Sequence, residues 1–393
     1  MKKALALVLA LGLTVSLVAC GNNNNNSAST NNGAVSEKQL TFKVGGIGPV
    51  TGGAAIYGQA IRNGIQIAVD EINAAGGING FNVDFRFEDD EHDSEKAINA
   101  YNSLKDWGMQ MLIGTTTSSP CIAVADRTKK DGMFQITPSG SAVECTANDN
   151  VFRVCFSDPN QGKASAEYIK DNNLGSKVGV IYDSSDVYSN GIYESFLTEA
   201  NAIGLSVVAE EQFTADSKTD FTTQLTKIKN AGADLVFLPF YYSEAALVLS
   251  QARDMAFSPV WFSCDGMDGI LTLENFDKSL AEGVMLLTPF SADATDSLTT
   301  NFVNVYKNNY GEVPNQFAAD SYDAMYILKA ALENANVSPS ESYTSICDAL
   351  KNSMTKINLN GLTGENMRWS ADGEPNKEPK AVVIENGEYK LHK

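Results

Sequence analysis

The sequence predicts an α/β fold made of two doubly wound parallel-sheet lobes. Three observations indicate this class. Short β-rich segments alternate with helical periods from Leu40 onwards, the alternation restarts after Phe156-Ser157-Asp158-Pro159, and 393 residues are enough for two domains of ordinary size. Because strand–helix–strand units place successive strands parallel, repeated units build parallel sheets that helices cover.

The first lobe shows both periodicities. Ile61, Ile65 and Ile72 fall on one stripe, as in an amphipathic helix, whereas Val83 and Phe85 alternate with polar residues, as in a strand. We expect strands at Leu40–Ile47, Asn82–Glu88, Met109–Gly114 and Met133–Thr137, and helices at Tyr57–Ala74, at Ser94–Trp107 with Ser94 as its cap, and at Cys121–Lys130.

The second lobe repeats this order, and the tail completes both lobes because it has too few strands for a third domain. In the second lobe we expect strands at Lys177–Tyr182, Ser206–Gln212, Leu235–Leu238 and Val260–Ser263, and helices at Gln161–Asn172, Gly191–Ala202, Phe221–Ala231 and Glu244–Met255. In the tail we expect strands at Gly283–Thr288, Asn366–Trp369 and Ala381–Glu385, and helices at Ser297–Tyr310, Phe317–Asn334 and Ser340–Met354.

The N-terminal segment predicts export and a lipid anchor. Lys2 and Lys3 precede an apolar run that is long enough for a secretory signal but short for a spanning helix. Leu17-Val18-Ala19-Cys20 resembles a bacterial lipobox, with Cys20 as the lipidated residue, and an ordinary signal peptide with a chance cysteine is the alternative. We therefore expect a signal peptide over residues 1–19 and a flexible, lipidated tether over residues 20–37, which hold the protein outside the cell membrane of a bacterium.

Composition excludes several functional classes. A formal net charge of −19 leaves no basic surface for nucleic acid or anionic lipid. No apolar run of membrane-spanning length follows Cys20, so the mature chain is not expected to cross a membrane. His92 and His392 are the only histidines, and neither has a partner at metal spacing. We expect no metal, no cofactor and no enzymatic activity.

Three motifs have competing interpretations. The glycines of residues 46–52 follow a strand like a dinucleotide loop, but the third glycine is one position late, so a glycine-rich turn beside a ligand is favoured. The acidic string Glu88–Glu91 lacks the spacing of a calcium loop and is interpreted as a solvated strand end. For Cys121 and Cys145, a disulfide and buried free thiols both stay open, with free thiols favoured.

Hydroxyl-rich loops follow two neighbouring strands of the first lobe. Gly114-Thr115-Thr116-Thr117-Ser118-Ser119 follows the third predicted strand, and Thr137-Pro138-Ser139-Gly140-Ser141 follows the fourth. In a parallel sheet, ligands bind beyond the carboxyl ends of the strands, where loop N–H groups and helix N-termini point outward. Helix capping explains either loop alone, but two such loops at adjacent strand ends favour a site for an anion such as a carboxylate.

Acidic and aromatic residues follow strands of the second lobe, at Asp183–Tyr188, Tyr241-Tyr242 and Cys264-Asp265-Gly266. Taken singly, such aromatics are typical of a core and such an aspartate of a helix cap. Opposite an anion site, however, a carboxylate with tyrosines suits an ammonium group, through a charge-assisted hydrogen bond and a cation–π contact. A carboxylate at one end and an ammonium at the other describe an amino acid.

On these residues the chain resembles the periplasmic-binding-protein type I receptors of branched-chain and hydrophobic amino-acid ABC transporters. The resemblance runs from Leu40 to about Leu391 and depends on an ordered set of motifs: Gly48-Pro49 through Tyr57-Gly58, Glu71-Ile72-Asn73-Ala74-Ala75-Gly76-Gly77-Ile78-Asn79-Gly80, Asp89-Asp90, Ile113-Gly114 and Ile136-Thr137-Pro138-Ser139. It implies a solute receptor without catalytic residues.

The resemblance also implies ligand-binding residues. The family's contacts with the α-carboxylate and α-ammonium groups fall on Ser118 and on Ser139, Gly140 and Ser141. The acidic partner of the ammonium group falls on Asp265, where the leucine/isoleucine/valine receptor has glutamate. The family's tyrosines correspond to Tyr57, Tyr188 and Tyr241.

These predictions combine into a two-lobed receptor. We expect lobe I over residues 38–157 and 289–376, and lobe II over residues 158–288 and 377–393, with hinge crossings near Cys155–Pro159, Leu286–Phe290 and Gly373–Pro379. The predicted function is capture of a free amino acid, branched-chain or otherwise apolar, and its delivery to an ABC permease by a monomer. A ligand sensor signalling to a membrane receptor, and a receptor for a small amide or urea-like solute, are the alternatives.

Overall fold

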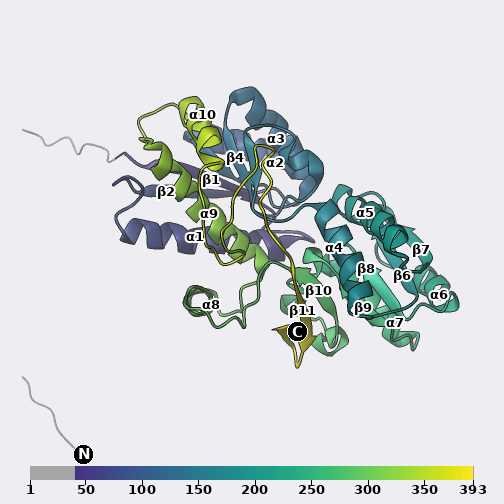
Figure 1. Cartoon of the computed structure of the whole chain (residues 1–393). Coiled ribbons are helices and arrows are strands. Elements are labelled where there is room, and N and C mark those ends of the chain that lie inside the picture. Colours follow the sequence, from purple (N-terminus) through teal and green to yellow (C-terminus); the bar gives the residue numbers. More distant parts are fainter. Residues whose placement is uncertain (1–39, 393) are drawn as a thin grey trace, which may run out of the picture. The chain divides into compact units, whose positions relative to one another are not determined.

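A computed structural model describes residues 40–392, which contain two β-sheets with helices packed against them (Figure 1). The predicted signal peptide, the tether and the Cys20 anchor lie outside the described residues. From Leu40 onwards the chain forms one compact unit by its contacts. The architecture confirms the predicted α/β class with parallel-sheet lobes.

A five-stranded parallel sheet in the order β2-β1-β3-β4-β5 forms the first lobe with its helices. The elements are β1 Phe42–Gly48, α1 Ala55–Ala74, β2 Val83–Asp89, α2 Ser94–Trp107, β3 Met111–Ile113, α3 Ser118–Asp131, β4 Phe134–Thr137, β5 Val151–Arg153, α8 Ser297–Tyr310, α9 Gln316–Ala335 and α10 Tyr343–Met354. Alternate side chains point to opposite faces, so Val44 clusters with α1 and α9, whereas Ile47 clusters with α2 and α3.

A seven-stranded mixed sheet in the order β12-β11-β10-β9-β8-β6-β7 forms the second lobe with its helices. The elements are α4 Asp158–Asp171, β6 Val178–Asp183, α5 Val187–Ile203, β7 Val207–Phe213, α6 Thr222–Asn230, β8 Leu235–Leu238, α7 Tyr242–Asp254, β9 Val260–Ser263, β10 Met285–Thr288, β11 Lys380–Glu385 and β12 Glu388–Leu391. Short 3₁₀ helices include η1 Val143–Thr146 and η3 Asp265–Met267.

The two sheets share one winding pattern. In the first, β2 and β3 flank β1; in the second, β7 and β8 flank β6, and all of these pairs are parallel. In each sheet the chain therefore adds one strand on one side of the first strand and the next strand on its other side. The winding direction thus reverses beside β1 and beside β6. Loops diverge at such a switch point, which leaves a crevice at the carboxyl ends of the strands.

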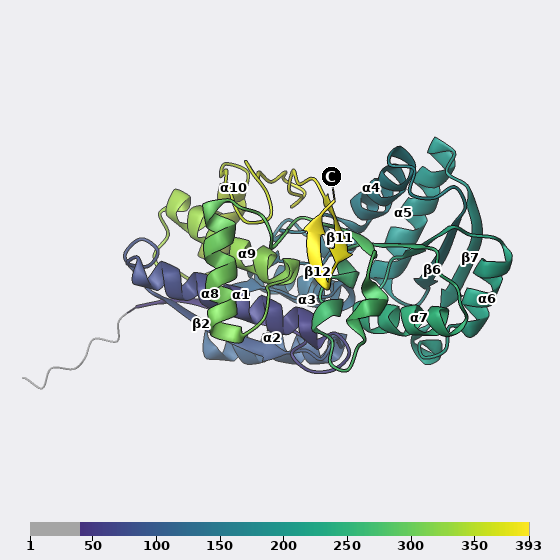
Figure 2. The same ribbon diagram turned by 90° about the horizontal axis from the view of Figure 1, so that it is seen from below.

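The C-terminal tail returns to both lobes. Helix α9 packs along α1, as Figure 2 shows, and α10 packs against β4. Strand β11 then pairs antiparallel with β10, and β12 pairs antiparallel with β11, so the second sheet is parallel only in part. The residue limits of the two lobes stay a prediction.

Some local predictions were wrong. Residues 366–369 form isolated bridges, Leu359 with Met367 and Trp369 with Pro375, instead of a strand. The buried Asp323 carboxylate accepts the N–H groups of residues 362 and 363, so side-chain bonds replace a sheet ladder here. The helix α2 is capped by the Asp93 side chain and not by Ser94. Strands β5 and β12 were not predicted, because each has only three or four residues and carries charged side chains.

Candidate ligand-binding site

A small buried cavity lies between the strand ends of the two lobes. It is lined by Tyr57, Thr116, Thr117, Ser118, Ser139, Ser141, Tyr188, Tyr241, Asp265, Gly266 and Phe317. Seven of the eight residues predicted for the site therefore meet in one cavity, and Gly140 does not line it. The free volume of the cavity is about 10 Å³, room for about one water molecule, so its own side chains nearly fill it.

The first-lobe wall offers hydrogen-bond donors. Ser118 is the first residue of α3, and its Oγ accepts the N–H groups of Ser141 at 3.3 Å and Ala142 at 3.2 Å. Since this oxygen accepts two bonds, its own hydrogen is left to donate to a ligand. The buried Ser141 hydroxyl has no well-directed partner among the described residues. Two hydroxyl donors beside a helix N-terminus form a site for an anion such as a carboxylate.

Arg153, the last residue of β5, stabilises the loop that carries Ser141 through hydrogen bonds to its backbone carbonyls. Its buried guanidinium donates to the carbonyls of Gly140 at 3.2 Å, Ser141 at 2.5 Å and Ala142 at 3.0 Å. In a trans peptide the N–H points opposite to the C=O, so these carbonyls turn two N–H groups toward Ser118. The sequence reasoning missed Arg153, because the strand that carries it was not predicted.

Ser139 and Gly140 support the loop in different ways. The Ser139 hydroxyl donates to the Thr116 carbonyl at 2.6 Å, so that hydrogen is already used. The Gly140 N–H donates to Thr137 Oγ1 at 2.7 Å, behind the cavity. A Cβ atom on Gly140 would lie 2.9 Å from Cys121 Sγ, so the close approach of the loop to α3 requires glycine.

The carboxyl group of Asp158, at the start of α4, faces the Ser141 hydroxyl. Burial raises the pKa of Asp158 well above its ordinary value, although the Ser141 hydroxyl lowers it. Neither carboxyl oxygen has a well-directed hydrogen-bond partner among the described residues. The raised pKa favours the neutral carboxyl group, which is the form that does not repel a ligand carboxylate at Ser141.

The second-lobe wall offers a buried negative charge. Asp265 follows β9, is 2% exposed, and accepts a 2.6 Å hydrogen bond from the Tyr188 hydroxyl, which in turn accepts the Gly266 N–H at 2.9 Å. Burial raises the pKa of Asp265 to about 7, and the nearby Asp320 charge adds to the rise. Within residues 40–392, no lysine or arginine pairs with this carboxylate. A ligand ammonium would supply the missing positive charge.

Aromatic rings form the remaining walls. Tyr57 lies against Phe317 with ring centroids 4.2 Å apart, and Tyr188 stacks on Tyr241 at 5.1 Å. Phe317 comes from α9 in the C-terminal tail, and sequence reasoning predicted it only as the start of a helix. Such rings can pack against an apolar side chain and against a cation.

Tyr57 also joins the two lobes. Its hydroxyl donates to the Gly266 carbonyl at 2.5 Å and accepts the Tyr242 N–H at 3.3 Å. The Tyr242 hydroxyl in turn accepts the Ile56 N–H at 3.3 Å. These contacts link α1 of the first lobe with the start of α7 and with the loop after β9, so the structure represents a closed cleft.

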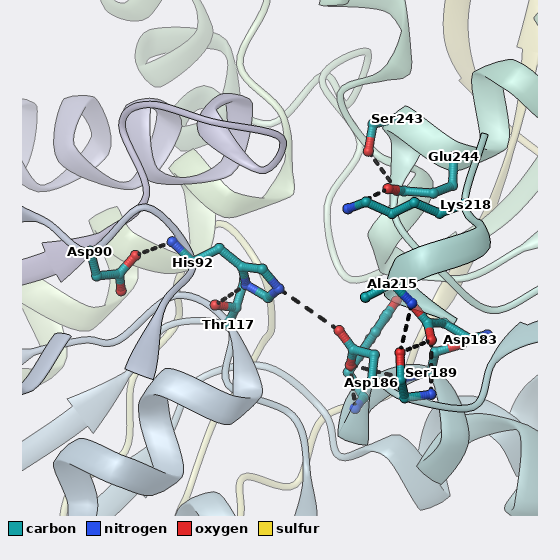
Figure 3. A network of polar contacts seen from close by, with 12 residues as sticks. Asp90, His92, Thr117, Asp183, Asp186, Ser189, Ala215, Lys218, Ser243 and Glu244 are labelled. Atoms are coloured by element: carbon teal, nitrogen blue, oxygen red, sulfur yellow. Dashed lines mark hydrogen bonds and ion pairs between the residues drawn. The ribbon is translucent and has the colours of Figure 1, made fainter. Parts of the chain in front are cut away.

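A polar chamber at the cleft mouth shares Tyr188 and Tyr241 with the inner cavity. In Figure 3, His92 and Asp186 point toward one another from different lobes, with His92 Nε2 4.0 Å from Asp186 Oδ2 and His92 Nδ1 2.8 Å from Thr117 Oγ1. Burial lowers the pKa of His92, whereas it raises the pKa of Asp186. The lowered pKa of His92 favours the uncharged imidazole at neutral pH, which weakens this contact.

Other candidate sites gain no support. The Asp89 carboxylate accepts the Val50 N–H and the Thr51 hydroxyl, so it holds the glycine-rich turn in place. No cluster of His, Cys, Asp and Glu in residues 40–392 is arranged to hold a metal ion. Over the same range, no helix has both the length and the apolar character needed to cross a bilayer. The five cysteines in this part of the chain are buried and free.

The family comparison covers most of the chain. A family model described as periplasmic binding protein matches residues 41–388. The Leu/Ile/Val-binding protein BraC3 of Rhizobium johnstonii is 30% identical over 313 residues, which cover 78% of this chain and 83% of the relative. The Leu/Ile/Val-binding protein homolog 3 of Brucella melitensis biotype 1 is 29% identical over 314 residues, which cover 77% and 82%.

Solved structures show a similar fold. A leucine-binding protein from Thermotoga maritima matches with a TM-score of 0.80 at 26% identity, over 90% of this chain and 98% of that chain. The branched-chain amino acid transporter substrate-binding protein of Streptococcus pneumoniae, solved in complex with isoleucine, matches with a TM-score of 0.81 at 28% identity, over 89% and 98%. Both likenesses extend over nearly all of the described residues.

Proposed function

The chain belongs to the periplasmic binding protein family, and from this premise we propose that it captures a free amino acid by closing its two lobes around it. Membership confirms the prediction of an extracytoplasmic solute-binding protein and not an enzyme. The proposal concerns the ligand, the residues that hold it and the delivery of the ligand.

One observation carries the proposal, namely the opposite chemistry of the two cavity walls. Ser118 presents a free hydroxyl donor, the Ser141 hydroxyl has no well-directed partner among the described residues, and Asp265 presents a buried carboxylate without a cation. A zwitterion satisfies both ends at once, with its carboxylate at the serines and its ammonium at Asp265.

The ligand's side chain is proposed to be apolar and branched. Tyr57, Tyr241 and Phe317 would surround it with aromatic surface. The names of the relatives and the isoleucine complex of the Streptococcus pneumoniae protein support this choice. Closure then needs no covalent chemistry, because a ligand that contacts both lobes stabilises the closed state by differential affinity.

Titration calorimetry with matched ligands tests the proposal. We expect leucine to bind with micromolar affinity, about −8 kcal/mol. Leucinamide lacks the carboxylate and 4-methylpentanoate lacks the ammonium, so each should bind at least about 30-fold more weakly, as one partner of a charge-assisted bond is lost. Equal binding of leucine and leucinamide would remove the carboxylate pocket from the proposal.

A thermal-shift screen of the twenty amino acids and small amides separates the alternatives. Only a ligand that prefers the folded state raises the unfolding midpoint. We expect the largest shifts from leucine, isoleucine and valine. A shift from acetamide or urea without one from any amino acid would instead support a receptor for amide-like solutes.

We also propose that the monomeric protein delivers its ligand to an ABC permease while lipid on Cys20 and the tether of residues 20–37 hold it at the membrane. Changing Cys20→Ala should move the protein from the membrane fraction to the soluble exported fraction. Deleting the gene should abolish high-affinity uptake of the ligand, whereas a pure sensor would leave uptake intact.

A further inference from the structure

Two buried cysteines lie behind the serine wall of the cavity. Cys121 belongs to the first turn of α3 and Cys145 to η1, and both are 0% exposed in one small cluster with Ala142. Cys264 and Cys347 belong to other clusters. Among the hydrophobic clusters of residues 40–392, this is the one that brings two thiols together.

Each thiol contacts a loop that forms the serine wall. The Cys145 thiol donates to the Ser118 carbonyl at 3.7 Å. Cys121 Sγ accepts the Gln135 amide at 3.6 Å and lies against Gly140, the residue before Ser141. Because protein interiors are close-packed, a shift of the two sulfur atoms also changes the positions of Ser118 and Ser141.

The two thiols differ in acidity. Interaction with the Cys145 thiol lowers the pKa of Cys121, and the Arg153 guanidinium also favours its thiolate. Burial raises the pKa of Cys145 well above its ordinary value. A thiol whose pKa is lowered, beside a second thiol, is the arrangement that favours thiol–disulfide exchange.

We propose that Cys121 and Cys145 form a modification site, where exchange with a small disulfide closes an intramolecular disulfide bond behind the serine wall. Both thiols are buried, so the external disulfide reaches them only when α3 and η1 open locally; the Cys121 thiolate then attacks one of its sulfurs, which releases one thiolate and leaves a mixed disulfide. Cys145 then loses its proton and attacks Cys121 Sγ, the protein disulfide forms, and the second thiolate leaves. Two protein thiols are oxidised and one external disulfide is reduced to two thiols.

The location and the connectivity favour this bond. An extracytoplasmic compartment permits disulfides, and the bond would enclose β4 together with Ser139, Gly140 and Ser141. The closed ring restrains the unfolded chain and keeps the loop near α3 when the cleft is empty. On the proposed function, which this last step requires, the oxidised protein releases its amino acid more slowly than the reduced protein does.

Incubation of the folded protein with oxidised glutathione tests the modification without any ligand. We expect the count of thiols in denaturant to fall by two, peptide mapping to link Cys121 with Cys145, and the unfolding midpoint to rise by roughly 5 °C. An unchanged thiol count, or a bond between other cysteines, would overturn the proposal.

Matched variants make the result specific. Cys121→Ala and Cys145→Ala should each abolish the linked peptide and the rise in midpoint, whereas Cys347→Ala, at a buried cysteine of another cluster, should keep both. If both single variants retained the rise, the bond would not be its cause. Failure of the amino-acid proposal appears separately, as absent heat in calorimetry with a normal thiol count.

Discussion

The two ends of the cavity are built on different physical principles. The serine end uses hydroxyl and backbone groups that Ser118, Ser141 and Arg153 hold in place before a ligand arrives. The aspartate end uses one carboxylate, Asp265, which is buried without a cation among the described residues and accepts a hydrogen bond from Tyr188. The first end is preorganised, whereas the second is incomplete until a cation binds.

On the proposed function, this difference gives the two lobes separate tasks. The first lobe can hold the carboxylate of a ligand while the cleft is open, because its donors need no partner from the second lobe. The second lobe then provides most of the gain on closure, since an ammonium removes the cost of the buried charge of Asp265. We therefore expect changes at Asp265 to weaken ligand binding more than changes at the serines do.

The largest expected effect comes from Asp265→Asn. It should weaken binding of leucine by about 3 kcal/mol, roughly 150-fold, because a buried partner of the ammonium is lost. The free variant should be at least as stable as the wild type at pH 8. The folded pKa of Asp265 is raised from 3.8 to about 7, so this carboxyl group lowers the free energy of unfolding as pH rises from about 4 to about 7, and that loss is nearly complete at pH 8. Unchanged affinity in calorimetry would remove Asp265 from the site.

The second effect is a pH dependence of binding. Protonation of Asp265, whose pKa burial raises to about 7, removes the charge that attracts the ammonium. Affinity should therefore be constant well above pH 7 and fall about tenfold by pH 6. Calorimetry at both values measures it, and Asp265→Asn should show a flat profile. A fall of equal size in that variant would assign the dependence to another group.

The third effect contrasts two serines of one loop. Ser141→Ala removes a hydroxyl that lacks a partner in the described part of the chain, so binding should weaken by about 1 kcal/mol, roughly fivefold, with little change in the unfolding midpoint. Ser139→Ala instead breaks the bond to the Thr116 carbonyl and should lower the midpoint by a few degrees. If Ser141→Ala lowered only the unfolding midpoint and left binding unchanged, the Ser141 hydroxyl would not be part of the serine end of the site.

The smallest effect is expected at the cleft mouth. His92→Gln should change affinity less than about threefold at pH 7.5, because the contact with Asp186 spans 4.0 Å and the lowered pKa of His92 favours its uncharged form at that pH. Stopped-flow measurement of ligand release checks that the dissociation rate changes as little as the affinity does. A loss as large as that of Asp265→Asn would make His92 part of the ligand site.

Local sequence patterns were sufficient for most of the fold. The helix α8 and the strands β8 and β9 match their predicted limits, because apolar periodicity and capping residues act within a few positions of each other. The predictions were wrong where contacts with segments far away in the sequence decide the local structure. Strand β5 exists through pairing with β4, and the segment at 366–369 is held by Asp323 from α9.

By itself, the sequence determined the α/β class, the family motifs and the residue types at the strand ends that meet in the cavity. These follow from short-range periodicity and from the rule that parallel sheets bind ligands at their carboxyl ends. Tertiary structure decided which groups are satisfied and which remain for a ligand. It turned Gly140 away, placed Arg153 behind the loop and Phe317 beside Tyr57, paired Tyr188 with Asp265, and set Cys121 beside Cys145. Burial and hydrogen bonding between segments far apart in the chain decide these points, and no local pattern encodes them.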